Sequence, residues 1–227
     1  DTLSHVSLSG VAFGLFLGFS PTISTVIVVI IAAVFLEYLR TVYKDFMEIG
    51  TAILMSTGLA LALVIMKGGG KSSMSLDQYL FGSTLTITDE QVLALFIIAA
   101  IVLVLTILFI RPMYILTFDE DTAYVDGLPV RLMSILFNIV TGVAIALMIP
   151  AAGSLLVSTI MVLPASIALK LGKTFRSVMI LAVVIGFVGM VSGLILSYYP
   201  DTPVSATITL LFVSFFLLSN LFVKFRK

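Results

Sequence analysis

The stretch "QVLALFIIAAIVLVLTILFIR" (residues 91–111) decides the fold class. Between its polar ends, every residue except Thr106 is apolar. About 20 consecutive apolar residues form a helix long enough to cross the hydrocarbon core of a bilayer. A lone strand would leave its backbone groups unpaired in lipid, so the stretch is predicted to be a transmembrane helix.

Further apolar segments extend this prediction over the whole chain: residues 4–19, 22–39, 47–66, 132–149, 152–170, 176–198 and 204–223. None shows the strict alternation of a membrane β-barrel. Hydrophobic residues make up 60% of the 227 residues, and charged residues only 11%. The sequence therefore predicts an all-α, polytopic membrane protein with about eight transmembrane helices.

The composition excludes several functional classes. No cysteine is present, so disulfide frameworks and thiolate metal sites are ruled out. Twelve Lys and Arg residues balance twelve Asp and Glu residues, and without a net positive charge nucleic acid is not an expected partner. A metalloprotease of the H-E-x-x-H type needs two histidines, whereas this chain has one. Any metal must therefore meet nitrogen and oxygen ligands.

Two stretches imitate a phosphate-binding loop: "GGGKSS" at residues 68–73 and "LGKT" at residues 171–174. The motif requires a glycine five residues before its Gly-Lys pair, and Ile65 and Ile167 stand at those positions. Neither stretch follows a predicted strand. The chain is therefore not expected to be an ATP-hydrolysing enzyme, and if it carries out active transport the energy must come from elsewhere.

Basic residues indicate the orientation. If the first span runs outward, ten of the twelve basic residues lie on one side of the membrane. The positive-inside rule makes that side cytoplasmic. The longest loop on this side is "RPMYILTFDEDTAYVDGLPVR" (residues 111–131).

This loop is predicted to contain a short helix. The acidic run at residues 119–121 favours a helix start, because negative charge stabilises a helix N-terminus. Gly127, followed by Pro129, favours a stop. A short helix displayed in the cytoplasm suits docking to a soluble partner; a merely solvated acidic loop is the alternative.

Asp1 and His5 are the candidate metal ligands. Four positions separate them, which places both on one helix face with Ser9 one turn further. A carboxylate and an imidazole so placed can share a divalent cation, with water or another helix completing its shell. In the alternative interpretation, which spacing alone favours, Asp1 caps the helix and His5 forms a hydrogen bond between helices. The location favours the metal, because ionisable groups in membrane spans tend to line transport paths.

Glycines recur at helical spacing in two of the segments: Gly10, Gly14 and Gly18, and Gly186, Gly189 and Gly193. Small residues in such rows let membrane helices approach closely. We expect both rows to mark helix-packing surfaces.

The stretch "DTLSHVSLSGVAFG" (residues 1–14) resembles the "GDALSHAVLPGVA" signature of the permease subunits of bacterial ABC importers for zinc and manganese. The stretches "YLFGS", "FDEDTAYVDGLPV" and "GSLLVSTIMVLPASIALKL" occur in the same order and at similar spacing in that family. The resemblance covers residues 1–227 and looks closest to the zinc-uptake permeases of Gram-positive bacteria. Two features depart from the family: its first span and the following basic turn have no counterpart, and Ser9 replaces the usual proline.

The resemblance implies a single transmembrane permease domain over residues 1–227, N-terminally truncated relative to the family, in the bacterial plasma membrane. Asp1 and His5 match the Asp and His thought to line the family's metal path. The acidic loop matches the coupling helix that contacts the ATPase. Ala123 and Gly127 fall on its Ala and Gly positions, and the expected coupling residues are Asp119, Glu120, Asp121, Ala123, Asp126 and Gly127.

The function implied is ATP-driven import of divalent metal, with zinc preferred on resemblance alone. No tightly bound cofactor is expected, since Zn²⁺ or Mn²⁺ is the transported substrate. The expected partners are a cytoplasmic ATP-binding subunit, an extracellular or periplasmic metal-binding lipoprotein, a second permease copy and the lipid bilayer. The alternatives are a manganese or iron permease of the same family, a siderophore or cobalamin permease, and an ATP-independent metal channel or carrier.

Overall fold

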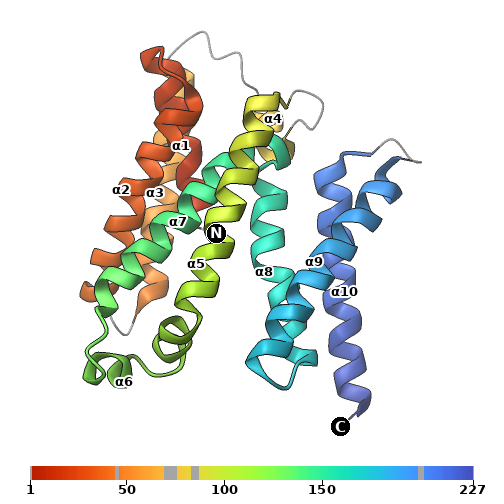
Figure 1. Cartoon of the computed structure of the whole chain (residues 1–227). Helices are drawn as coiled ribbons and strands as arrows, with labels where there is room; N and C mark the ends of the chain where they lie inside the picture. The colour runs from red at the N-terminus through yellow and green to blue at the C-terminus, as the bar shows by residue number, and fades with distance from the viewer. Residues whose placement is uncertain (1, 44–45, 69–75, 83–86, 199–201, 227) are drawn as a thin grey trace. The chain divides into compact units, whose positions relative to one another are not determined.

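The computed structural model describes residues 2–43, 46–68, 76–82, 87–198 and 202–226. All regular secondary structure in these ranges is helical, which confirms the all-α prediction (Figure 1). The helices are α1 (Thr2–Leu17), α2 (Pro21–Val42), α3 (Met47–Gly68), α4 (Leu76–Phe81), α5 (Asp89–Phe118), α6 (Glu120–Val125), α7 (Val130–Ala152), α8 (Ser154–Leu171), α9 (Phe175–Tyr198) and α10 (Val204–Arg226).

Seven of the described helices are long and apolar enough to cross a membrane, namely α2, α3, α5 and α7 to α10. The helix α1 is apolar but has only 16 residues. Each of the predicted segments therefore corresponds to one helix, and seven of these helices have spanning length. The polytopic architecture is confirmed.

Two compact units are distinguished, and each is described by itself. One unit contains α1 to α3, α5, α6 and most of α7, and the other contains α4, the end of α7 and α8 to α10. The prediction of one permease domain over residues 1–227 stays a prediction.

In the unit that contains α1, this helix packs against both α2 and α3 (Figure 1). A methyl group added to Gly10 would lie 2.5 Å from the Cα of Thr25 on α2. One added to Gly58 of α3 would lie 2.8 Å from the Cα of Val6 on α1. The backbones of these three helices approach so closely because glycine has no side chain at the contacts, as predicted for Gly10.

Gly18 has a different role from the one predicted. It follows the end of α1 with φ of +73°, and no atom lies within 4 Å of the position of an added methyl group. The N–H of Phe19 donates to the carbonyl of Gly14 at 2.9 Å. Gly18 therefore ends the helix in a left-handed conformation, which glycine adopts at little cost, instead of packing against a neighbour.

In the other unit, α8, α9 and α10 pack together around Leu156, Ile208 and Phe212. Gly189 of α9 lies directly against the Phe212 ring, and Gly193 lies against Ile208. The predicted packing role of these two glycines is confirmed. The short helix α4 joins this unit, where the Ser205 hydroxyl donates to the carbonyl of Phe81 at 2.9 Å.

The long loop predicted for residues 111–131 is wrong in its first part. The helix α5 continues through Pro112 and ends only at Phe118. Tyr114 and Phe118, one turn apart, bring their ring centroids to 4.8 Å, and the Thr117 hydroxyl donates to the carbonyl of Met113 at 2.6 Å. The ring contact one turn apart and the apolar run after the proline favour this continuation, although Pro112 cannot donate one backbone hydrogen bond.

Candidate functional site: the α6 helix and its polar anchor

The helix α6 begins and ends at the predicted residues. Asp119 precedes it in an extended conformation and accepts hydrogen bonds from the hydroxyl of Thr122 and from its backbone N–H, the latter at 3.0 Å. Both bonds lower the pKa of the exposed Asp119 carboxyl, and the bond from the Thr122 hydroxyl has the larger effect. At the other end, Gly127 has φ of +76° and donates to the carbonyl of Tyr124 at 3.1 Å. The predicted short helix is confirmed.

The two faces of α6 differ in exposure. The Ala123 side chain is completely buried, whereas Tyr124 and Val125 are 77% and 83% exposed. The acidic residues of the segment are exposed as well: Asp119, Glu120, Asp121 and Asp126. The small side chain of Ala123 lets the helix lie close to its support, while an apolar pair among carboxylates faces outward. Such a surface can meet another protein.

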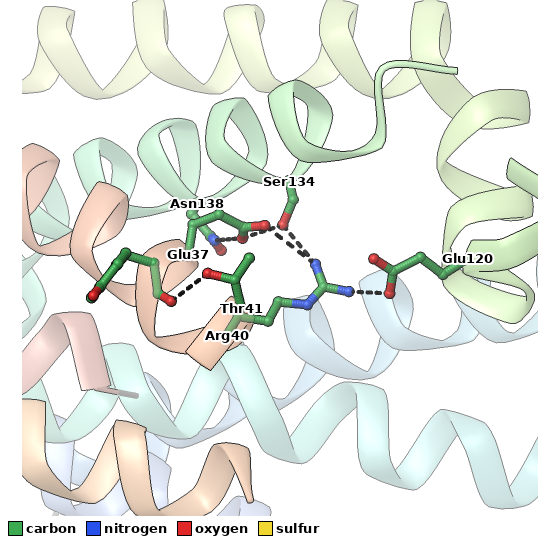
Figure 2. Close-up of polar contacts among 7 residues, drawn as sticks. Glu37, Arg40, Thr41, Glu120, Ser134 and Asn138 are labelled. Carbon is green, nitrogen blue, oxygen red and sulfur yellow. Dashed lines mark hydrogen bonds and ion pairs between the residues drawn. The ribbon is translucent and has the colours of Figure 1, made fainter. Parts of the chain in front are cut away.

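Arg40, in the last turn of α2, ties α6 to two other helices. Its Nη2 donates to Oε2 of Glu120 on α6 at 2.7 Å, and its Nη1 donates to Oγ of Ser134 on α7 at 2.9 Å. Figure 2 shows the guanidinium lying between Glu120 and Ser134. A planar guanidinium can hold two acceptors in fixed directions, so one side chain links three helices.

Glu37 supports this arrangement from the interior of α2. It is only 4% exposed, one turn before Arg40. Its Oε2 accepts a hydrogen bond from the Ser134 hydroxyl at 2.6 Å and one from Nδ2 of Asn138 at 3.4 Å, while its Oε1 lies 3.8 Å from Nη1 of Arg40. A buried carboxylate is tolerated because it is paired and hydrogen-bonded. We call Glu37, Arg40, Glu120, Ser134 and Asn138 the α6 anchor.

Sequence reasoning missed the α6 anchor as a group. Its members lie up to 101 positions apart in the chain, as for Glu37 and Asn138. One signal was available, because Glu37 is an acidic residue inside the predicted span 22–39. Such a residue in a membrane helix predicts a polar partner on a neighbouring helix.

Of the other two predicted site residues, the structure describes only His5, near the start of α1. His5 is half-buried on this helix, and Asp1 lies outside the described residues. The Ser9 hydroxyl, one turn further, donates to the carbonyl of Val6 in its own helix at 2.7 Å. Among the residues that the structure describes, no three His, Asp or Glu side chains form a group that could hold a metal ion. The two-ligand site at Asp1 and His5 stays a prediction.

Comparisons with known proteins place the chain in a family. The ABC 3 transport family matches residues 1–223. The chain belongs to this family. A solved structure described as PsaBC from Streptococcus pneumoniae in complex with Fab has a TM-score of 0.82 and 27% sequence identity, over 96% of this chain and 79% of that chain. The chain is thus an ABC transporter permease and a multi-pass inner-membrane protein, as the resemblance predicted.

Curated relatives of this ABC-3 permease are named for the metals they transport. The high-affinity zinc uptake system membrane protein ZnuB of Haemophilus influenzae is 29% identical over 219 residues, which cover 96% of this chain and 84% of ZnuB. The manganese import system permease protein ScaB of Streptococcus parasanguinis is 27% identical over 220 residues, covering 96% of this chain and 78% of ScaB. Zinc and manganese permeases are therefore both represented among the relatives.

Proposed function

We propose that this ABC-3 permease imports divalent metal ions, zinc before manganese, driven by ATP hydrolysis on a separate subunit. The observation that carries the proposal is the family match over residues 1–223, with zinc and manganese permeases among the relatives. The absence of cysteine from the sequence fits nitrogen and oxygen ligands. The preference for zinc over manganese rests on the resemblance to zinc-uptake permeases alone.

In the proposed mechanism, metal passes Asp1 and His5 on its way inward. A transport site must bind its ion well enough to admit it and weakly enough to release it. Two protein ligands with a mostly hydrated ion meet this demand better than a closed cage of four ligands. Only neutral imidazole binds metal, so protons compete with the cargo at His5.

The helix α6 is proposed to receive the motion of the ATPase. Its exposed Tyr124 and Val125, among exposed carboxylates, give a cytoplasmic partner both apolar and charged contacts. The further partners in this proposal are an extracellular or periplasmic metal-binding lipoprotein and a second copy of the permease. A siderophore or cobalamin permease would move chelated metal, and a channel or carrier would need no ATPase.

The test is metal accumulation in cells that lack their own uptake system and express the full-length permease with its ATPase and binding protein. Zinc uptake is expected to fall at least about tenfold in Asp1→Ala and His5→Ala, because loss of a side chain that binds a metal or orients its ligand commonly lowers metal affinity this much. Asp89→Ala, which removes an exposed carboxylate in the first turn of α5, is the matched control. Protein levels are measured for every variant.

Two outcomes would contradict parts of the proposal. Normal uptake in both variants would remove Asp1 and His5 from the path but leave the transporter intact. Uptake that persists with an ATPase subunit unable to hydrolyse ATP would favour a channel or carrier. Repeating the assay with manganese decides the cargo.

A further inference from the structure

The α6 anchor concentrates the described charged contacts of α6 on one residue of another helix. Arg40 reaches Glu120 with one nitrogen and Ser134 with the other, at 2.7 Å and 2.9 Å. These acceptors belong to α6 and α7, while Arg40 itself is part of α2. Movement of α6 that keeps both bonds must therefore move the adjoining ends of α2 and α7 as well.

The inner end of this connection is held firmly. The buried Glu37 carboxylate accepts from Ser134 at 2.6 Å, and Ser134 in turn accepts from Arg40. The Asn138 amide donates to the same carboxylate oxygen at 3.4 Å. A buried, hydrogen-bonded polar group has few alternative positions. The Ser134 hydroxyl that accepts from the Arg40 guanidinium is therefore itself held in place by Glu37.

The helix α2 leads onward to the helix that carries His5. The backbones of α1 and α2 are in direct contact where Gly10 meets Thr25, so a shift of α2 toward α1 meets closely packed atoms. The helix α2 also contacts α7. A methyl group added to Gly142 of α7 would lie 2.5 Å from Cγ1 of Val29 on α2. A shift of α2 is therefore passed to both neighbours through packed atoms.

We propose that Arg40 is a positioning residue that transmits displacement of α6 to α2 and α7, and through α2 to the helix that bears His5. The inference rests on the proposed function, in which α6 meets the ATPase. The pair is partly open to solvent, since the Arg40 and Glu120 side chains are 35% and 54% exposed. Exposed pairs of this kind contribute little to folding stability, so their removal loosens α6 without unfolding the protein.

The experiment uses the full-length permease, reconstituted in proteoliposomes with its ATPase and binding protein, and measures zinc transported per ATP hydrolysed. Arg40→Lys keeps the charge but lacks the two-nitrogen fork, so transport per ATP is expected to fall at least about fivefold while ATP hydrolysis continues. Glu120→Gln should cause a smaller fall. Transport per ATP in the double variant should be no lower than in Arg40→Lys, because both changes act on the same contact between Arg40 and Glu120.

Matched controls come from the same unit. Arg131→Lys changes an exposed arginine near the start of α7, and Glu48→Gln changes an exposed glutamate in the first turn of α3. Both should transport zinc per ATP as the wild type does. The inference is overturned if Arg40→Lys transports as much zinc per ATP as the wild type. It is also overturned if the losses of the two single variants multiply in the double variant, or if ATP hydrolysis and protein level fall in parallel with transport.

A second measurement does not depend on cargo. Residues 1–227 contain no cysteine, so Tyr124→Cys adds an exposed attachment point for a spin label on α6. Arg40→Lys should increase the mobility of this label in the full-length permease measured without its ATPase, where the proposed partner does not cover residue 124, and Arg131→Lys should not. Unchanged mobility in Arg40→Lys overturns the inference, whereas a wild type that moves no metal counts against the proposed function instead.

Discussion

The helices α1 and α6 are held in their unit by opposite means. The closest approaches of α1 to its neighbours are made at glycines, at Gly10 against Thr25 and at Gly58 against Val6. Its Ser7 and Ser9 hydroxyls donate to carbonyls of α1 itself, at 2.5 Å and 2.7 Å. The helix α6 is held by Arg40, which reaches from α2 to Glu120 and is itself hydrogen-bonded to Ser134 of α7. Close packing holds the helix of the predicted metal path, and a few directional bonds hold the helix that is predicted to face the cytoplasm.

The largest expected effect tests the packing side of this comparison. Gly10→Val places methyl groups where the Thr25 backbone stands, since even the Cβ would lie 2.5 Å from its Cα. Overpacking of this kind is expected to lower the free energy of unfolding by about 3 kcal/mol. Thermal unfolding in detergent measures the change.

The control for this prediction is Gly68→Ala at the end of α3. A methyl group added there meets no atom within 4 Å, so the midpoint should not fall. Equal midpoints for Gly10→Val and the wild type would show that α1 and α2 can separate without cost.

The buried end of the α6 anchor should give an intermediate effect. Glu37→Ala removes the acceptor of Ser134 and Asn138. Leaving buried donors without their acceptor costs about 2 kcal/mol. Glu37→Gln keeps one acceptor oxygen and should lose less stability. Unfolding midpoints in detergent separate the two variants, and Glu48→Ala, an exposed position, provides the baseline. Equal midpoints for Glu37→Ala and Glu48→Ala would contradict the role given to the buried carboxylate.

The smallest expected effect concerns the start of α6. Hydrogen bonds from Thr122 lower the pKa of Asp119 below its ordinary value, which is about 3.9. A carboxyl whose pKa is lower in the folded state stabilises that state fully above the ordinary range, and the effect is lost as pH falls through the lowered pKa. The mobility of the Tyr124→Cys label should therefore rise on acidification.

The measurement is made in a Glu120→Gln background, in which the ion pair with Arg40 is absent at every pH. Asp119→Asn keeps an acceptor for Thr122 that does not titrate and should flatten the pH profile. Identical profiles with and without Asp119→Asn would assign the change to other carboxyl groups.

The helices and the ends of α6 could be predicted because their signals are local. Apolar length defines a span, and the acidic start of α6 and Gly127 act within a few residues of the helix they bound. The α6 anchor could not be predicted, because Arg40 meets Glu120 across 80 positions and no local pattern pairs them. Pro112 misled the prediction of the loop, since its effect on a helix depends on the residues that follow it.

The continuation of α5 through Pro112 has a consequence for where α6 stands. A helix of 30 residues is about 45 Å long, whereas the hydrocarbon core of a bilayer is about 30 Å thick. Tilt of the helix takes up part of the excess length, and the remaining turns of α5 protrude from the hydrocarbon core and place α6 beyond the lipid tails. Each residue in this protruding end of α5 rotates the chain by about 100° about the helix axis. The direction in which Glu120 faces Arg40 is therefore set by the number of residues between the membrane and Asp119.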